Sequence, residues 1–298
     1  MAGDTPSTPP AKSATLLGFM CGAGAALCWA IGFVTARHGI DGGLSPLVIA
    51  LHRYVWPGLA LLPFVAANSP GDLGGIGWRR GITLAIFGGL PLALWSYIGY
   101  LFVPLGHGGI IQPSCAALGG LILARLVLKE PLPARRVVGA LAIVLGLIVI
   151  GAEAFRTIGA AGVGGDLLFV AAGSSFAVFG MLVRKWRIAA MQAAAITSVL
   201  SLVGLPILLF RFDNFLAAGF FENLLQAVAQ GALAGAGAIY LFTRAVLLLG
   251  ASRASVFPSL VSPFVLLIGF LALGIVPSIA QLVGLAIVIV GFRLTQRA

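Results

Sequence analysis

Four serines near the end of the chain have a spacing that could line a polar path through a membrane. They are separated by three or four residues, which places all of them on one helix face: Ser252, Ser255, Ser259 and Ser262. Pro258 lies within this stretch and removes a backbone hydrogen bond. The pattern predicts either hydroxyl groups that face a pore or small residues that let two helices pack closely.

Aromatic and amide side chains inside apolar segments could hold a substrate. Trp29 and Tyr97 lie deeper than residues that anchor a helix at the membrane surface. Their ring faces can stack on an aromatic ligand or attract an amine by cation–π interaction. We therefore predict a substrate-binding set that also includes amides and hydroxyls: Trp29, Tyr97, Gln112, Ser114, Phe176, Tyr240, Ser259 and Ser262.

Basic side chains inside apolar segments are a second candidate group, because an isolated charge is costly in lipid. Arg53 would cost at least about 2.5–3.5 kcal/mol at the bilayer centre, so it is expected to contact either a substrate or a helix carbonyl. His52 and His107 are the histidines placed to carry a proton near neutral pH. Arg244 could join the buried charges His52 and Arg53, or its side chain could reach the cytoplasmic membrane surface.

The residues that surround these side chains predict an all-α integral membrane protein. Of the 298 residues, 60% are hydrophobic and 9% are charged, whereas about a quarter of a soluble domain is charged. A membrane-spanning helix needs about 20 apolar residues, and ten such segments can be placed. They lie near residues 15–36, 45–67, 81–103, 107–128, 134–152, 165–184, 189–210, 224–248, 253–273 and 275–293.

Lys and Arg are distributed unevenly between the predicted loops. Ten spans place both termini on one side, and assigning that side to the cytoplasm puts most of the basic residues there. The net charge of +10 is therefore a topology signal and does not indicate a nucleic-acid-binding surface. No Asp or Glu falls inside a predicted span, which favours facilitated movement over coupling to a proton or a sodium ion.

Two stretches of the chain repeat each other. Residues 113–146 align without a gap on residues 258–291, so that Pro113 falls on Pro258 and Ser114 falls on Ser259. Five spans in each half make the second half enter from the opposite side, which predicts two inverted repeats around a central cavity. The paired prolines, Pro113 and Pro258, are then candidate gates on opposite sides of the membrane.

The repeats predict how the chain is divided. The expected parts are residues 1–14 as a disordered cytoplasmic leader, 15–152 as the first five-helix repeat, 153–164 as a connecting loop, 165–293 as the second five-helix repeat and 294–298 as a cytoplasmic tail.

Several of these features resemble the EamA-type drug/metabolite transporters. They are glycine-rich first and sixth spans, an Arg inside the second span, and a Pro-Ser span followed by Lys129-Glu130. The second half departs from the family pattern, because Gly274-Ile275 stands where an acidic residue is frequent. Among these transporters the chain looks most similar to bacterial exporters of aromatic amino acids. The resemblance implies export, and a place in the bacterial inner membrane.

The predicted function is therefore outward movement of small metabolites, above all aromatic or neutral amino acids, by facilitated alternating access. Proton-driven export of cationic drugs or other metabolites is the alternative, and a membrane-embedded enzyme or a channel is a lower one. Neither a nucleophile–base pair nor paired carboxylates are visible in the sequence, so no catalytic residue is assigned. We predict no metal and no cofactor, because the three cysteines are scattered without a CxxC pair. A monomer suffices for the pathway, although glycine spacings also permit a dimer.

Overall fold

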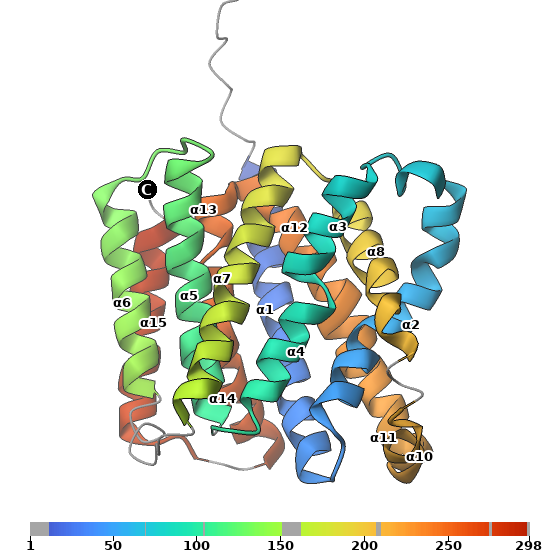
Figure 1. The fold of residues 1–298 in the computed structure, drawn as a ribbon. Coiled ribbons are helices and arrows are strands. Elements are labelled where there is room, and N and C mark those ends of the chain that lie inside the picture. The colour runs from blue at the N-terminus through green and yellow to red at the C-terminus, as the bar shows by residue number, and fades with distance from the viewer. Residues whose placement is uncertain are drawn as a thin grey trace, which may run out of the picture.

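The computed structural model describes residues 12–68, 70–103, 105–150, 162–206, 210–273 and 276–296, and every regular element within these ranges is helical (Figure 1). Some predicted features fall outside the described residues. They are most of the leader, most of the loop at 153–164, the Gly274-Ile275 departure and the last two residues of the tail.

The first half of the chain forms six α-helices and a short 3₁₀-helix: α1 (Lys12–Asp41), α2 (Pro46–Ala67), η1 (Pro70–Asp72), α3 (Trp78–Gly88), α4 (Leu90–Gly99), α5 (Leu105–Leu126) and α6 (Ala134–Ile150). The second half begins with α7 (Gly162–Trp186), α8 (Ala190–Leu200), η3 (Ser201–Gly204), α10 (Phe212–Ala217) and α11 (Gly219–Gln226). It continues with the π-helix η4 (Ala227–Gly237), α12 (Ala238–Leu249), α13 (Ala251–Ala254), η5 (Phe257–Leu260), α14 (Val261–Leu273) and α15 (Ile279–Gln296).

Eight helical segments in the described part of the chain are long and apolar enough to cross a membrane. Two of the ten predicted spans, 134–152 and 189–210, are occupied by shorter helices. Helix α6 has 17 residues up to the point where the described range ends, and α8 has 11 residues followed by the 3₁₀-helix η3. At about 1.5 Å per residue, the 11 residues of α8 alone fall short of the roughly 30 Å of a bilayer core.

Two spans that look continuous in sequence change helix type or direction in the structure. The predicted span 81–103 bends at Gly89, directly before Leu90 and Pro91 open α4. Segment 251–273, which contains α13, η5 and α14, tightens into a 3₁₀-turn at Pro258. Proline removes a helical hydrogen bond, and nearby helices can support the freed backbone groups in a membrane protein.

Helices α6 and α15 pack against each other at the edge of the bundle (Figure 1). A Cβ atom added at Gly139 would lie 2.6 Å from the carbonyl oxygen of Gly291, and one added at Gly146 would lie 2.7 Å from that of Gly284. This pairing of residues makes the two helices antiparallel. In the sequence alignment Gly139 corresponds to Gly284 and Gly146 corresponds to Gly291, so each contact is the counterpart of the other.

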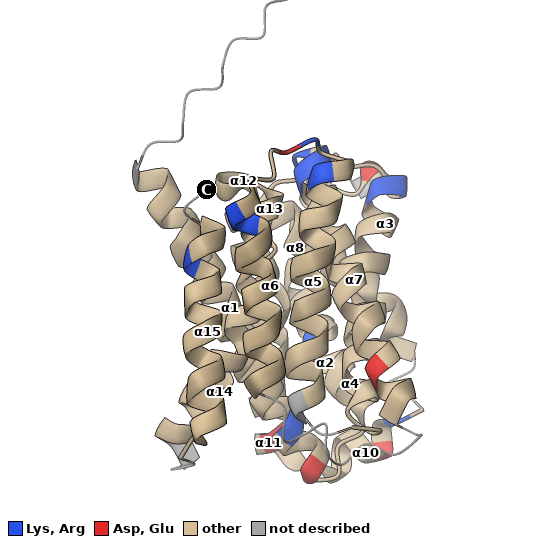
Figure 2. Ribbon diagram, turned by 90° about the vertical axis from the view of Figure 1, so that its left-hand side faces the viewer, with Lys and Arg blue, Asp and Glu red and all other residues tan. Residues whose placement is uncertain are grey.

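The two ends of the bundle differ in charge. Helix α1 begins and α15 ends at the same end of the molecule (Figure 1). Figure 2 shows most of the Lys and Arg ribbon at this end, where α3 begins, and acidic ribbon around α10 and α11 at the opposite end. The distribution agrees with the loop charges that led us to predict cytoplasmic termini.

Candidate functional site

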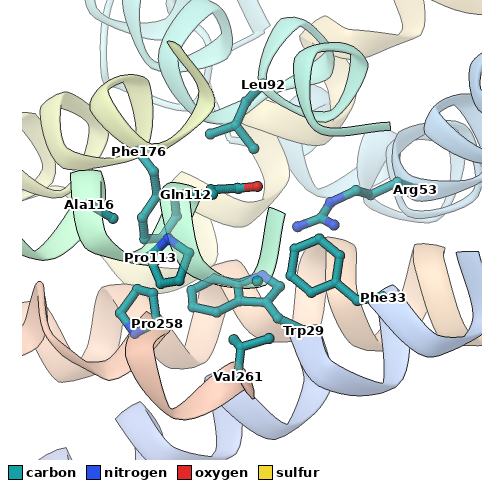
Figure 3. Close-up of a pocket in the computed structure, with 11 residues that line it drawn as sticks. Trp29, Phe33, Arg53, Leu92, Gln112, Pro113, Ala116, Phe176, Pro258 and Val261 are labelled. Carbon is teal, nitrogen blue, oxygen red and sulfur yellow. The ribbon is translucent and has the colours of Figure 1, made fainter. Parts of the chain in front are cut away.

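A cavity lies among α1, α2, α4, α5, α7 and segment 251–273 (Figure 3). Six of the residues that line it were singled out in the sequence: Trp29, Arg53, Gln112, Phe176 and the two gate prolines, Pro113 and Pro258. The remaining lining residues are Phe33, Leu92, Gly109, Ala116 and Val261. Phe33 could have been found, because it lies one helical turn after Trp29 on the same face of α1.

One wall of the cavity is aromatic. The ring of Trp29 meets that of Phe176 edge to face, with centroids 5.0 Å apart. Phe242 on α12 packs behind both rings, with its centroid 4.5 Å from that of Phe176 and 5.7 Å from that of Trp29. Such ring pairs hold one another in fixed orientations, so the wall presents a rigid surface to a ligand.

Arg53 approaches the cavity from the other side, and its guanidinium group points toward the amide of Gln112 (Figure 3). Its Nη1 donates a hydrogen bond of 2.9 Å to the hydroxyl of Tyr97. Tyr97 in turn donates to Oε1 of Gln230 at 2.6 Å. Gln230 also donates to the carbonyl of Gly32, so the network joins α2, α4, η4 and α1.

The π-helix η4 brings Gln230 into this network. Wide helical turns of this kind are rare and often mark functional sites. Glycines at 231 and 235 let η4 approach the backbone of α2 closely, because a Cβ atom at Gly231 would lie 2.9 Å from the carbonyl oxygen of His52. The sequence alone did not reveal the bond between Gln230 and Tyr97.

Tyr97, Tyr240 and Arg244 were candidates for binding or buried charge, but they are not among the residues that line the cavity. Tyr97 is fully buried and contributes by holding Arg53. Tyr240 and Arg244 are half-buried on α12, outside the cavity lining. Helix α12 instead contributes Phe242, which backs the aromatic wall.

The serine stripe is buried and bonds mainly to backbone, which favours the packing alternative over hydroxyls that face a pore. Ser259 donates to the carbonyl of Val256 at 2.6 Å, and Ser255 donates to the carbonyl of Ser252. A serine hydroxyl bonded to the preceding turn has no donor left for a ligand. Ser114 is also buried outside the lining, and its hydroxyl has no partner among the described residues.

Two contacts between α5 and segment 251–273 flank the cavity. On one side a Cβ atom at Gly120 would collide with the side chain of Ser255. On the other side Ser262 donates a 2.5 Å hydrogen bond to the carbonyl of Gly109. Pro113 and Pro258 lie between these two contacts and line the cavity. Small residues therefore hold the two helices together on both sides of the prolines.

Glu130 closes the end of the bundle that carries the C-terminus. Its carboxylate accepts hydrogen bonds from the backbone N–H groups of Ala251 at 3.2 Å and Ser252 at 3.1 Å. It also lies 3.6 Å from Nε of Arg184 on α7. The residue therefore ties the loop after α5 to the start of segment 251–273, a role that the sequence did not reveal.

His52 belongs to the opposite end of the bundle and not to the cavity. Its Nδ1 accepts from the indole N–H of Trp56 at 2.7 Å, and its Nε2 lies 3.0 Å from Oδ1 of Asn223. The amide nitrogen of Asn223 donates to the carbonyls of Phe215 and Gly219, which leaves Oδ1 to accept from His52. Because both ring nitrogens are used in this way, the ring is neutral and structural. This geometry argues against the predicted coupling role.

An acid lies inside a helix that the sequence prediction had kept free of acids. Helix α7 begins at Gly162, so it includes Asp166, and Oδ1 of Asp166 lies 2.9 Å from Nδ1 of the buried His107. The predicted topology assigns Asp166 to the outside of the membrane, although it lies at the edge of the span predicted near 165–184, and so does not count it as an acid within a span. His107 therefore faces a carboxylate, as the alternative of proton exchange would require.

In the described part of the chain, no group of three or more His, Cys, Asp or Glu residues is placed to hold a metal ion. The three cysteines, Cys21, Cys28 and Cys115, are unpaired thiols.

Comparison with known proteins supports a transporter. Residues 16–152 match the model of the EamA-like transporter family, which implies a membrane transporter of small molecules. No curated protein matches the chain. A protein of known crystal structure is 19% identical, with 96% of each chain covered and a TM-score of 0.70. At that identity the likeness shows a shared fold alone.

Proposed function

We propose that this chain, whose first half matches the EamA-like transporters, exports aromatic or neutral amino acids across a bacterial inner membrane by facilitated alternating access. The observation that supports it most is the central cavity, with an aromatic wall and with one gate proline from each half of the chain. Aromatic faces such as Trp29 and Phe176 suit a planar apolar side chain. The basic end of the bundle is assigned to the cytoplasm, which places both termini there.

The physical basis of alternating access is the pairing of α5 with segment 251–273. Inverted halves can adopt two related packings, one open to each side. In our proposal the Gly120–Ser255 contact and the Gly109–Ser262 contact open in turn while the cavity stays between them. Because both halves belong to one polypeptide, a monomer is sufficient.

Transport can be tested with purified protein in liposomes. We expect uptake of labelled phenylalanine or of a neutral amino acid down its gradient, above that of liposomes without protein. If a panel of amino acids and cationic drugs gives no uptake in either direction, the proposal is wrong.

The gating can be tested separately with cysteines at Ser114 and Ser259 in a variant lacking the three native cysteines. Both positions are buried next to the gate prolines, so a water-soluble thiol reagent should reach them only when the neighbouring contact opens. We expect added substrate to change the labelling rate at both positions. Labelling that never occurs at either position would contradict the gating.

Proton exchange is a second candidate mechanism, because His107 contacts Asp166 inside the bundle. Buried ionisable groups of this kind often lie on proton pathways in membrane carriers. An imposed pH gradient without a substrate gradient separates the two mechanisms. Substrate accumulation driven by that gradient would favour exchange, and its absence would favour facilitated movement.

A further inference from the structure

Arg53 is the one charged side chain among the described residues that line the cavity. It is 7% exposed, and the Tyr97 hydroxyl that accepts its hydrogen bond is a neutral group. A buried charge in a protein is ordinarily paired with an opposite charge. The cavity thus contains a positive charge that the lining itself does not neutralise.

The guanidinium is held in place and still has hydrogen-bonding capacity. Tyr97 fixes Nη1, and the onward bond from Tyr97 to Gln230 fixes Tyr97. The Nε donor is buried and has no hydrogen-bond partner among the described residues. An arginine has five N–H donors in a planar fork, which matches the two oxygens of a carboxylate. The group is therefore oriented before a ligand arrives.

The rest of the cavity limits what the ligand can be. Trp29, Phe33 and Phe176 supply apolar ring surface, and Gln112 supplies an amide opposite Arg53 (Figure 3). Oε1 of Gln112 lies 3.0 Å from the hydroxyl oxygen of Ser96, which lies equally close to the carbonyl oxygen of Leu92. A phosphate-rich ligand would need several cations, whereas a single guanidinium suits a single negative charge.

From these contacts we infer that Arg53 is the carboxylate anchor of the cavity, and that the substrates are aromatic monocarboxylates, with or without an amino group. This inference rests on the proposed transport function and narrows its substrate class. An aromatic amine without a carboxylate brings its positive charge toward Arg53 and is excluded. That outcome disfavours the cationic-drug alternative.

The test compares three ligands that differ at one group. L-Phenylalanine has a carboxylate and an amine, 3-phenylpropanoate has the carboxylate alone, and phenethylamine has the amine alone. In liposomes that hold wild-type protein, we expect 3-phenylpropanoate to inhibit phenylalanine uptake at least tenfold more strongly than phenethylamine. A tenfold ratio corresponds to about 1.4 kcal/mol. Equal inhibition, or stronger inhibition by the amine, would overturn the inference.

A binding measurement separates this inference from the transport proposal. Ligands that bind the folded state raise its thermal stability, so wild-type protein in detergent should be stabilised by 3-phenylpropanoate and not by phenethylamine. Stabilisation by the acid without any uptake would defeat the transport proposal and leave the anchor intact. No stabilisation and no inhibition by the acid would defeat the anchor.

Substitutions at Arg53 distinguish an anchor from a purely structural residue. Arg53→Gln removes the charge and should abolish the preference for the acid over the amine, whereas Arg53→Lys should retain part of it. A structural role alone would lower stability and leave the preference unchanged. Arg37→Gln is the matched control, because Arg37 pairs with Asp41 at the exposed end of α1, and its preference should equal that of the wild type.

Discussion

Replacing Gly146 by alanine tests whether α6 and α15 form a rigid scaffold. The new Cβ atom would lie 2.7 Å from the carbonyl oxygen of Gly284 and 2.8 Å from the backbone nitrogen of Val288. Ordinary van der Waals contact begins near 3.4 Å, so the helices must move apart by about 0.7 Å. Both opposing atoms belong to the backbone, so a side-chain rotation cannot relieve the clash. We expect a loss of about 1–3 kcal/mol, the usual cost of overpacking.

The loss can be followed as the apparent melting temperature of the purified protein in detergent. A change of 1 kcal/mol moves the midpoint of a chain of comparable size by about 2–4 °C, so we expect a decrease on the order of 2–10 °C. Gly164→Ala on α7 is the control, because a Cβ atom there meets nothing within 4 Å and alanine favours a helix. A melting temperature that is the same for both variants would refute the close packing of α6 on α15. In both variants, 3-phenylpropanoate should still inhibit phenylalanine uptake more strongly than phenethylamine does.

Three further substitutions address the two ends of the bundle and the closing of the cavity. Glu130→Gln removes the negative charge of a carboxylate that accepts hydrogen bonds from two backbone N–H groups. Because hydrogen bonds to a charged group contribute about 1.5–3 kcal/mol, the melting temperature should fall by several degrees. Gly120→Ala should slow uptake strongly and raise the labelling of cysteines placed at Ser114 and Ser259, because the new Cβ atom would collide with Ser255 and hold the contact open. The adjacent Gly119→Ala is the control and should have the smaller effect, since its Cβ atom meets another side chain at 3.0 Å. His52→Gln should lower stability through the loss of its bond to Asn223 and leave the pH profile of uptake unchanged; a shifted profile would restore His52 as a proton carrier.

Much of the fold could be predicted because lipid imposes a simple rule on the sequence. Long apolar runs mark helices, and eight of the predicted segments have the expected length. The lengths of α6 and α8 and the bend at Gly89 could not be predicted with the same rule. Hydrophobicity does not record where a helix changes direction, because neighbouring helices decide whether freed backbone groups find partners. The ten-span arrangement and the inverted repeats stay predictions for the same reason.

The candidate site could be predicted in part, and the residue types explain which part. Aromatic residues and prolines deep in apolar segments have few roles besides packing and binding, and Trp29, Phe176, Pro113 and Pro258 all reach the cavity. Hydroxyls were poorer guides, because a serine in a helix can satisfy itself on the preceding turn. Ser259 does so. Long-range partners such as Glu130 and the start of α13 have no signature at all in sequence spacing.

Glycine serves two purposes in this bundle, and the atoms that lie opposite each glycine show which purpose it serves. Opposite Gly139 and Gly146 are backbone atoms of α15, which cannot yield unless the whole helix moves. Opposite Gly120 and Gly109 are serine side chains on segment 251–273, which Pro258 already interrupts. Hydrogen bonds between membrane helices contribute only about 0.6 kcal/mol on average, so the bond that closes the cavity at Gly109 can break at small cost. Movement should therefore concentrate between α5 and segment 251–273, with α6 and α15 as the fixed frame.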